Sequence, residues 1–449
     1  MDTIAALATA PFKAAIGVIR MSGPEAFSIA EACLRFPGSG RLIAEDRKRN
    51  VAFAYLHDRG EVVDEVVVTA FRGPYSYTGE DTVEFSCHGG VYLLDRVLRL
   101  LFSKGARQAL GGEFTKRAFL NGKSDLTRAE GVMDLIDAEY SSAARAAMSE
   151  LDGTVGNAIG EIRGQILAIT AKLLAYVDYP DDEIGEVSTE EIDLLLTEAL
   201  TRVRTLTASY GKGKILREGV RTALCGRPNV GKSSLMNLFA GENRSIVTDI
   251  AGTTRDTVTE SVVFGGVKLL LTDTAGIRET EDRVEKIGVD RAVQAMEKAD
   301  LILCVFGDHP DEQDRVIGEK ALQYQGKTLF LFNKSDLYDA PLPAWASAAP
   351  SFRISAVTGD GMPKLEACLA DLFATDLPAG SAVITNGRQY QCLCRIESAL
   401  ARASDNLTLT PDVIVSDLEE ALAAVGEITG ERVSDSIVHE IFSRFCVGK

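Results

Sequence analysis

The chain has 449 residues and a mass of 48.3 kDa, enough for several domains of about 100–200 residues each. Hydrophobic residues make up 46% and charged residues 25%, which excludes a chain that is disordered throughout. The formal net charge of −17 argues against a protein that coats nucleic acid nonspecifically, because that affinity comes from clustered lysine and arginine. The acidity is uneven: the first 120 residues carry 15 basic and 14 acidic side chains, so a local basic site is not excluded.

The eight cysteines are scattered and form no Cys-x-x-Cys pair, so the sequence predicts reduced thiols instead of a zinc site or a disulfide framework. No apolar stretch reaches about 18 residues, and the first residues lack a basic segment that leads into an apolar one. We therefore expect a soluble, cytoplasmic protein with no membrane segment.

Residues 1–118 predict a small α+β domain. Short apolar runs with strand-like composition alternate there with Gly, Pro and Asp breaks, and one helical pattern interrupts them. The predicted strands are residues 16–21, 51–56, 62–71 and 83–87, and the predicted helix is residues 91–104.

A helical pattern fills two separate stretches, 119–215 and 379–449. Between them, apolar strands alternate with amphipathic helices over 216–378, which predicts a doubly wound, mostly parallel sheet. The Gly-Lys-Gly-Lys run at 211–214 and the run at 378–381 are the expected joints. The sequence therefore predicts an α/β domain inserted into a helical domain that is split in sequence.

The strongest motif runs from Gly226 to Ser233 and reads Gly-Arg-Pro-Asn-Val-Gly-Lys-Ser, the pattern of a phosphate-binding loop. An apolar strand at 220–225 precedes it and a helical run at 234–240 follows it. Its glycines let backbone N–H groups surround a phosphate at a helix N-terminus. Lys232 would reach the β- and γ-phosphates and the Ser233 hydroxyl would hold Mg²⁺. The predicted GTP contacts in this loop are Asn229, Val230, Gly231, Lys232, Ser233 and Ser234.

Three further turns follow predicted strands in the order that a GTPase requires. Asp273-Thr-Ala-Gly276 would place a carboxylate beside Mg²⁺, through water, and the Gly276 amide near the γ-phosphate. Asn333-Lys-Ser-Asp336 would bind guanine, because a carboxylate accepts from both the ring N–H and the exocyclic amine, which adenine does not match. Ser355-Ala356 would donate a backbone N–H to the guanine carbonyl. The predicted contacts are Asp273, Thr274, Ala275, Gly276, Asn333, Lys334, Asp336, Ser355 and Ala356.

Gly252-Thr-Thr-Arg-Asp256 lies where a GTPase has its first switch, and residues 216–378 resemble the TrmE–Era-like class of GTPases. Motifs over the whole chain resemble the MnmE (TrmE) family of tRNA uridine-modifying GTPases. One departure is Pro11-Phe-Lys-Ala-Ala-Ile16, where the family often has a Gly-rich segment. The family-like motifs are residues 2–4, 17–23, 77–81, 88–90, 112–121, 216–219 and 445–449.

This resemblance implies hydrolysis that depends on K⁺, without an arginine finger. Ile277 follows the Asp273–Gly276 turn where Ras-like proteins have a water-orienting Gln, and Glu285 matches the family residue that orients the attacking water. Thr254 would close onto Mg²⁺. The resemblance places K⁺ on the Asn229 side chain and on the backbone carbonyls of a switch loop at Thr248, Ile250 and Thr253. It places GTP contacts in the same loop at Thr248, Thr253 and Thr254.

The resemblance also implies a 5-formyl-tetrahydrofolate or related one-carbon folate in the N-terminal domain, at Arg20, Glu84, Lys123 and Lys449. Cys446 is a candidate nucleophile there. The implied partners are a second copy of the chain, bound through the N-terminal domain with GTP-dependent pairing of the GTPase domains, the FAD-dependent MnmG protein, and tRNA. The implied activity adds an aminomethyl or carboxymethylaminomethyl group to C5 of the wobble uridine of certain tRNAs.

Two alternatives remain open from the residues. The chain would otherwise be a ribosome-assembly or regulatory switch GTPase without modifying activity, although the N-terminal domain and the acidic segment after 378 count against this. A metabolic ATPase is disfavoured by Asn333–Asp336.

Overall fold

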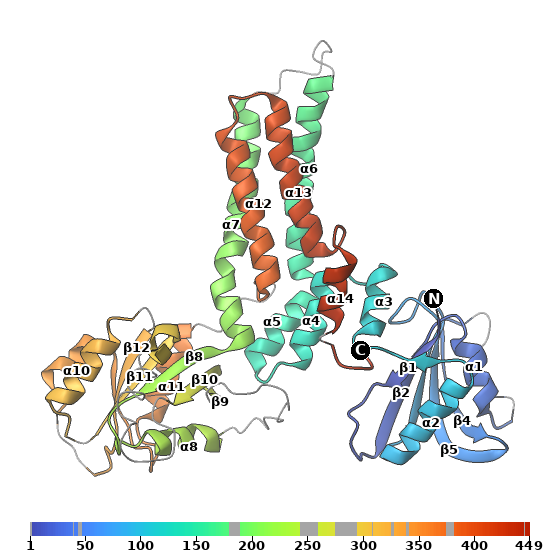
Figure 1. Ribbon diagram of the computed structural model, residues 1–449, viewed down its shortest axis with the longest axis horizontal. Coiled ribbons are helices and arrows are strands. Elements are labelled where there is room, and N and C mark those ends of the chain that lie inside the picture. Colours follow the sequence, from blue (N-terminus) through green and yellow to red (C-terminus); the bar gives the residue numbers. More distant parts are fainter. Residues whose placement is uncertain are drawn as a thin grey trace. The chain divides into compact units, whose positions relative to one another are not determined.

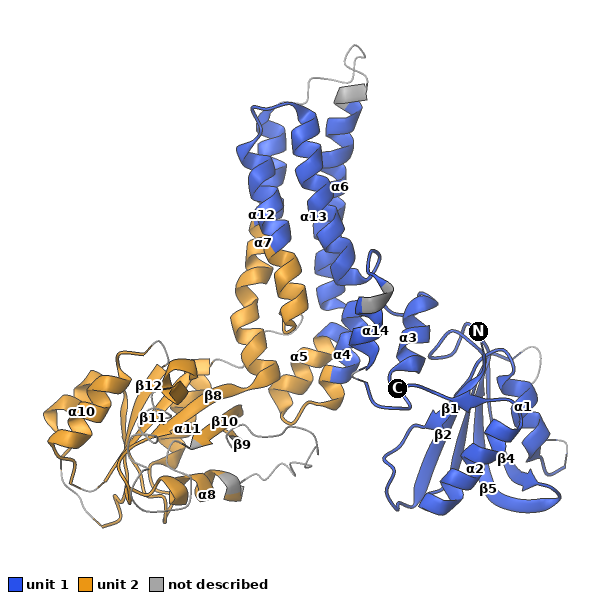
Figure 2. Cartoon of the chain, viewed as in Figure 1, with its two compact units in different colours: residues 1–133, 150–200, 395–449 blue, residues 134–149, 201–394 orange. Residues whose placement is uncertain are grey.

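The computed structural model describes residues 2–38, 40–43, 47–178, 189–242, 259–273, 294–307, 309–324, 327–337, 341–373, 381–443 and 445–449. Its contacts group the chain into two compact units. The first contains residues 1–133, 150–200 and 395–449, and the second contains residues 134–149 and 201–394 (Figure 2). None of the described helices is long and apolar enough to cross a membrane. The predicted domain boundaries at 118, 215 and 378 stay a prediction.

The N-terminal part of the first unit is a seven-stranded sheet with the order β3-β4-β5-β6-β2-β1-β7 (Figure 1). All four predicted strands and the predicted helix are confirmed. The strands are β1 (Ile4–Leu7), β2 (Ile16–Ser22), β3 (Leu34–Arg35), β4 (Arg49–Asp58), β5 (Glu61–Phe71), β6 (Thr82–His88) and β7 (Arg107–Gln108), and the helices are α1 (Ala26–Cys33), α2 (Val91–Ser103) and α3 (Glu113–Leu120).

Alternation along the strands divides this sheet into a buried and an open face. Val66, Val68 and Ala70 of β5 are buried in one core with residues of α1 and α2, whereas Val67 on the same strand is 45% exposed. The other face, called the open face, carries the intervening residues, which include the paired positions Arg20 of β2 and Glu84 of β6; at β1 this face is covered by Phe114, which packs with Ile4 and Ala6.

Seven helices make up the helical part of the chain among the described residues: α4 (Leu126–Ile136), α5 (Ser141–Leu151), α6 (Thr154–Asp178), α7 (Thr189–Glu218), α12 (Gly387–Asp405), α13 (Pro411–Thr429) and α14 (Asp435–Ser443). Within the first unit, α6 packs along α13. Leu126 and Ala129 of α4 share a core cluster with Val438 and Phe442 of α14. Helices that lie before and after the α/β domain in the sequence thus pack together, as predicted.

The second unit contains a six-stranded sheet with the order β13-β12-β11-β8-β10-β9 (Figure 1). All neighbouring strands pair in parallel except β9 and β10, so the prediction of a mostly parallel sheet is confirmed. The strands are β8 (Val220–Cys225), β9 (Thr259–Phe264), β10 (Val267–Asp273), β11 (Leu301–Phe306), β12 (Lys327–Phe332) and β13 (Ser351–Arg353), with α8 (Lys232–Glu242), α10 (Glu312–Ala321), the 3₁₀ helix η1 (Ala344–Ala348) and α11 (Met362–Phe373) around them.

The prediction of a joint at 211–214 is wrong, because this run lies inside α7. A Cβ atom on Gly213 would lie 2.0 Å from the carbonyl oxygen of Ile384, so glycine allows the helix and that segment to approach closely. Tyr210 also stacks on Tyr390, with ring centroids 4.2 Å apart. Packing here outweighs the cost of about 1 kcal/mol that glycine brings to a helix. The second expected joint, 378–381, lies outside the described residues except for Ser381.

Candidate functional site

The phosphate-loop motif connects β8 to α8, as predicted. Gly226 and Gly231 have φ angles of 144° and 98°, in the region that favours glycine. A Cβ on Gly226 would lie 2.2 Å from the carbonyl oxygen of Val305, and one on Gly231 would lie 2.1 Å from Nδ2 of Asn333. The loop therefore follows its tight path only with these glycines, against the neighbouring strand ends.

Lys232, the first residue of α8, is buried, with 6% of its surface exposed. Its Nζ donates to the carbonyl oxygens of Gly226 and Arg227, at 2.8 and 2.7 Å. Arg227 itself pairs with Asp311, the residue that caps α10. The ammonium group is thus held against the loop that would surround a phosphate.

Asn333 joins the phosphate loop to the predicted guanine-binding turns. Its Nδ2 donates to the carbonyl oxygen of Val230, and its Oδ1 accepts from the backbone N–H of Ala356, both at 2.9 Å. The Ser355 hydroxyl donates to Oδ1 of Asp336 at 2.6 Å. The three turns therefore meet at the carboxyl end of the sheet, where open α/β folds bind ligands.

The cation-binding predictions are only partly within the described residues. Asn229 has a φ angle of 63° and is exposed in the loop, while Ser233 lies in the first turn of α8. Asp273 ends β10, at the register position of Leu224 on β8. An amide, a hydroxyl and a carboxylate supply oxygen ligands, which fit Mg²⁺ and K⁺. The predicted residues Thr248, Ile250, Thr253, Thr254, Thr274, Ala275, Gly276 and Glu285 lie outside the described residues.

A second constellation lies on the open face of the N-terminal sheet. Nε of Arg20 donates to Oε1 of Glu84 at 2.8 Å, and Nη1 of Arg20 donates to the carbonyl oxygen of Gly448 at 3.5 Å. The guanidinium carbon lies 5.3 Å from the ring centroid of Tyr77 and 5.8 Å from that of Phe114. A cation, a carboxylate and two aromatic rings therefore converge here.

The C-terminal residues contribute to this region through their backbone. Val447 forms an antiparallel bridge with Gly111, and the N–H of Phe114 donates to the carbonyl oxygen of Lys449 at 3.2 Å. Cys446 is exposed, and its carbonyl oxygen accepts from the N–H of Gly112 at 3.3 Å. The predicted residue Lys123 bonds elsewhere, because its Nζ donates to the carbonyl oxygen of Pro74.

Arg117 is a residue whose importance the sequence analysis missed. Its side chain is 5% exposed and pairs with Asp2 at 2.9 Å, with Glu80 at 3.1 Å and with Glu113 at 3.1 Å. Arg107 also binds Asp2 and holds the pKa of its carboxyl at about 2. This network connects three of the sequence motifs that were noted only as family-like, so those motifs support the Arg20 region structurally.

Tyr77 and Phe114 were also missed as site residues, although both lie in the family-like motifs. The signal available in the sequence for Tyr77 was an aromatic residue next to Thr-Gly, and in the structure its side chain is 39% exposed. Phe114 had none, because it is fully buried and an ordinary core residue by composition.

Comparison with known proteins finds two family models that match adjacent parts of the chain. A family model described as the MnmE helical domain matches residues 126–446, and one described as the GTP-binding protein TrmE N-terminus matches residues 3–123. The chain belongs to the MnmE family. Two MnmE relatives are proteins named tRNA modification GTPase MnmE, from Natranaerobius thermophilus and Akkermansia muciniphila. They are 41% and 42% identical to this chain over 100% of its length and 99% of theirs.

Among solved structures, the G domain of the Thermotoga maritima FeoB iron transporter is similar to part of this MnmE-family chain. It is 23% identical, covers 34% of this chain and 97% of its own, and has a TM-score of 0.27. The family assignment therefore rests on the sequence matches.

Proposed function

We propose that the chain hydrolyses GTP to modify C5 of the wobble uridine of certain tRNAs, working in the cytoplasm as a homodimer with the FAD-dependent MnmG protein. Membership of the MnmE family assigns GTP hydrolysis in tRNA modification. The finer steps of the proposal are the addition of an aminomethyl or carboxymethylaminomethyl group and a folate one-carbon donor. The observation that supports them most is the presence of two separate groups of residues that suit a ligand, one for a nucleotide and one on the N-terminal sheet.

The nucleotide constellation supports GTP over ATP. Asp336 is held by Ser355, and Asn333 links the phosphate loop to Ala356. A carboxylate oriented by a hydroxyl suits the paired donors on one edge of guanine. Lys232 and the loop amides would bind the phosphates, and Ser233 with Asp273 would hold Mg²⁺, which supplies charge neutralisation of the phosphates. We propose Thr254 and Glu285 as the residues that close onto Mg²⁺ and orient the attacking water.

The N-terminal constellation suits a flat, polar ring with an anionic tail, the chemistry of a one-carbon folate. Glu84 is half-buried and accepts from Arg20, so it is fixed as an acceptor for ring N–H groups. Tyr77 and Phe114 offer aromatic surface, and Arg20 offers positive charge. We propose Arg20 and Glu84 as the central folate contacts, with Lys123 and Lys449 at its periphery and Cys446 as a candidate nucleophile.

Deleting the gene tests the tRNA chemistry directly. We expect mass spectrometry of tRNA nucleosides from the deletion strain to show loss of the aminomethyl or carboxymethylaminomethyl group at the wobble uridine. A plasmid copy of the gene restores it. Unchanged nucleosides in the deletion strain would refute this modification while leaving the GTPase assignment intact.

Arg20→Gln tests the folate site. We expect the affinity for 5-formyl-tetrahydrofolate, measured by isothermal titration calorimetry, to fall roughly 10- to 100-fold, because a charge-assisted hydrogen bond contributes about 1.5–3 kcal/mol. GTP affinity should stay unchanged. The matched control is Arg99→Gln, which removes an exposed arginine paired with Asp95 on α2 of the same domain. Equal folate affinity in the two variants would reject Arg20 as a contact.

A further inference from the structure

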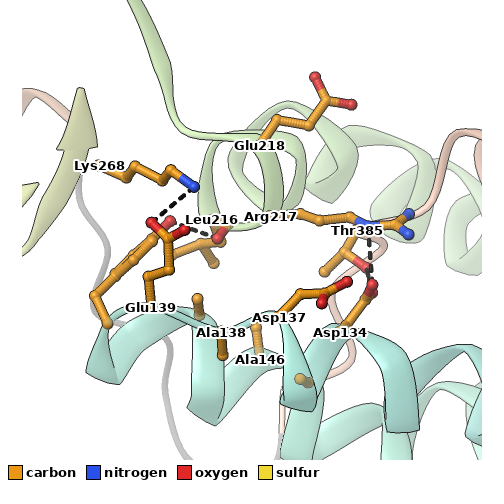
Figure 3. A pocket seen from close by; sticks show the side chains of 13 residues that line it. Asp134, Asp137, Ala138, Glu139, Ala146, Leu216, Arg217, Glu218, Lys268 and Thr385 are labelled. Carbon is orange, nitrogen blue, oxygen red and sulfur yellow. Dashed lines mark hydrogen bonds and ion pairs between the residues drawn. The ribbon is translucent and has the colours of Figure 1, made fainter. Parts of the chain in front are cut away.

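A cavity of about 200 Å³ lies inside the second unit, where the turn between α4 and α5 meets the end of α7 and the start of β10 (Figure 3). We call residues 134–142 the helical corner. The cavity is unusual for its charge, because four carboxylates and two cations line it: Asp134, Asp137, Glu139, Glu218, Arg217 and Lys268.

One set of contacts fixes the helical corner to the end of α7. Asp134 is only 9% exposed at its side chain and pairs with Arg217 at 3.0 Å. The Tyr140 hydroxyl donates to the carbonyl oxygens of Leu216 and Ile215, at 2.5 and 3.2 Å. Burial raises the pKa of Tyr140, so the hydroxyl stays a neutral donor. Helix α7 leads directly into β8 and the phosphate loop, so the corner is attached to the base of that strand.

A second set of contacts joins the same corner to β10. Nζ of Lys268 lies 2.8 Å from Oε2 of Glu139, and the Ser142 hydroxyl donates to the carbonyl oxygen of Gly266 at 3.4 Å. Strand β10 ends at Asp273, about 16 Å from Lys268 at roughly 3.3 Å per residue. The corner therefore contacts the end of α7, which leads into β8, and the start of β10, and the carboxyl ends of these two strands are among those that precede predicted nucleotide-binding turns.

The Lys268–Glu139 ion pair can exchange partners more readily than the Arg217–Asp134 ion pair. The side chains of Lys268 and Glu139 are 18% and 35% exposed, and the cavity beside them also presents Asp137 and Glu218. Lys268 can change carboxylate partners there without leaving a buried charge unpaired. Asp134 is more deeply buried and also accepts a hydrogen bond from the Thr385 hydroxyl at 3.4 Å, so its pair with Arg217 is held more firmly in place. The contact to β10 is thus the exchangeable one.

We propose that Lys268 and Glu139 are positioning residues that couple GTP turnover to tRNA modification, an inference that rests on the proposed function. Strand β10 is hydrogen-bonded on both sides, to β8 and β9, so a displacement at Asp273 is carried along it to Lys268. The ion pair passes that displacement to the helical corner, from which α4 and α5 continue into the helical segments of the chain. Neither residue is among the predicted nucleotide contacts.

The test expresses Lys268→Gln, Glu139→Gln and the exchanged pair K268E/E139K in the deletion strain, and purifies each full-length chain. For both single variants, we expect GTP hydrolysis within about twofold of wild type. We expect each single variant to restore the modified tRNA nucleosides that the deletion strain lacks at least fivefold less well than the wild-type gene does. The exchanged pair should recover modification to within about twofold, because it re-forms the ion pair with opposite polarity.

Arg221→Gln is the matched control, because Arg221 lies outside the helical corner and pairs with Asp300 at 3.0 Å at the base of the same sheet. It should leave both activities unchanged. Single variants that modify tRNA as well as wild type would overturn the proposal. Single variants that lose GTP hydrolysis in parallel with modification would also overturn it, as would an exchanged pair that recovers no modification. If Lys268→Gln folds poorly, the test relies on Glu139→Gln. A wild-type gene that restores no nucleoside would overturn the proposed function, and this inference with it.

Discussion

Asp336→Asn should lower the affinity for GTP by about 10²- to 10⁴-fold and raise the affinity for xanthosine triphosphate. The substitution replaces an acceptor of two guanine donors by an amide that donates, and hydrogen bonds to a charged acceptor contribute about 1.5–3 kcal/mol each. Xanthine has a carbonyl oxygen where guanine has its amine, so the new N–H group gains a partner. Ser355 remains able to donate to the oxygen of the introduced amide, as it does to Oδ1 of Asp336.

Calorimetric dissociation constants for both nucleotides, on the wild type and the variant, measure this effect. Asp360→Asn is the matched control: it makes the same change of charge in the adjoining loop, where Asp360 is exposed and bonds to Ser355 only through its backbone carbonyl. An Asp336→Asn protein that keeps its GTP affinity, or loses affinity for both nucleotides equally, would contradict the guanine assignment.

The nucleotide site could be predicted from sequence because each part is a short turn after a strand. Gly226, Gly231 and Lys232 are required locally by backbone conformation and charge, so they leave a fixed spacing that a single sequence displays. The link from Asn333 to Val230 spans 103 residues, and nothing in the motif predicted it. The spacing therefore predicts which turns meet, while the side chains that connect them emerge only from the folded sheet.

The remaining misses have the same physical origin. Arg117 joins Asp2 and Glu80, from which it is separated by 115 and 37 residues, and each charge alone resembles a solvated surface residue. The run at 211–214 looked like a joint because glycine normally weakens helices, but contact with Ile384 makes glycine favourable there. Helix α1 was not predicted because it has eight residues and neither a side-chain cap nor an acidic residue in its first turn. For Arg117 and the run at 211–214 a tertiary contact overrides the local signal, and α1 is stabilised by packing of Ala26, Ile29, Ala30 and Cys33 into the core beneath the sheet.

Replacing K⁺ by Na⁺ at equal ionic strength should lower GTP turnover by about 10²-fold, the usual effect of removing one preorganised electrostatic contact to a transition state. A bound K⁺ would offset the charge that develops on the bridging oxygen between the β- and γ-phosphates. Asn229 suits the role of a ligand, because it is exposed in the phosphate loop and its φ of 63° is uncommon for a residue other than glycine.

Asn229→Gly removes the proposed K⁺ ligand without changing the loop conformation, because glycine adopts the left-handed conformation and has no carboxamide. We expect turnover in K⁺ to fall to the level measured in Na⁺, so that the ratio of the two rates approaches one. GTP affinity should stay within about threefold, because Lys232 and the loop amides remain. Pro228→Ala, at the neighbouring exposed position, should keep the wild-type ratio. A variant that retains full K⁺ stimulation would show that Asn229 is not a ligand, whereas an equal rate of the wild type in both salts would reject the K⁺ site altogether.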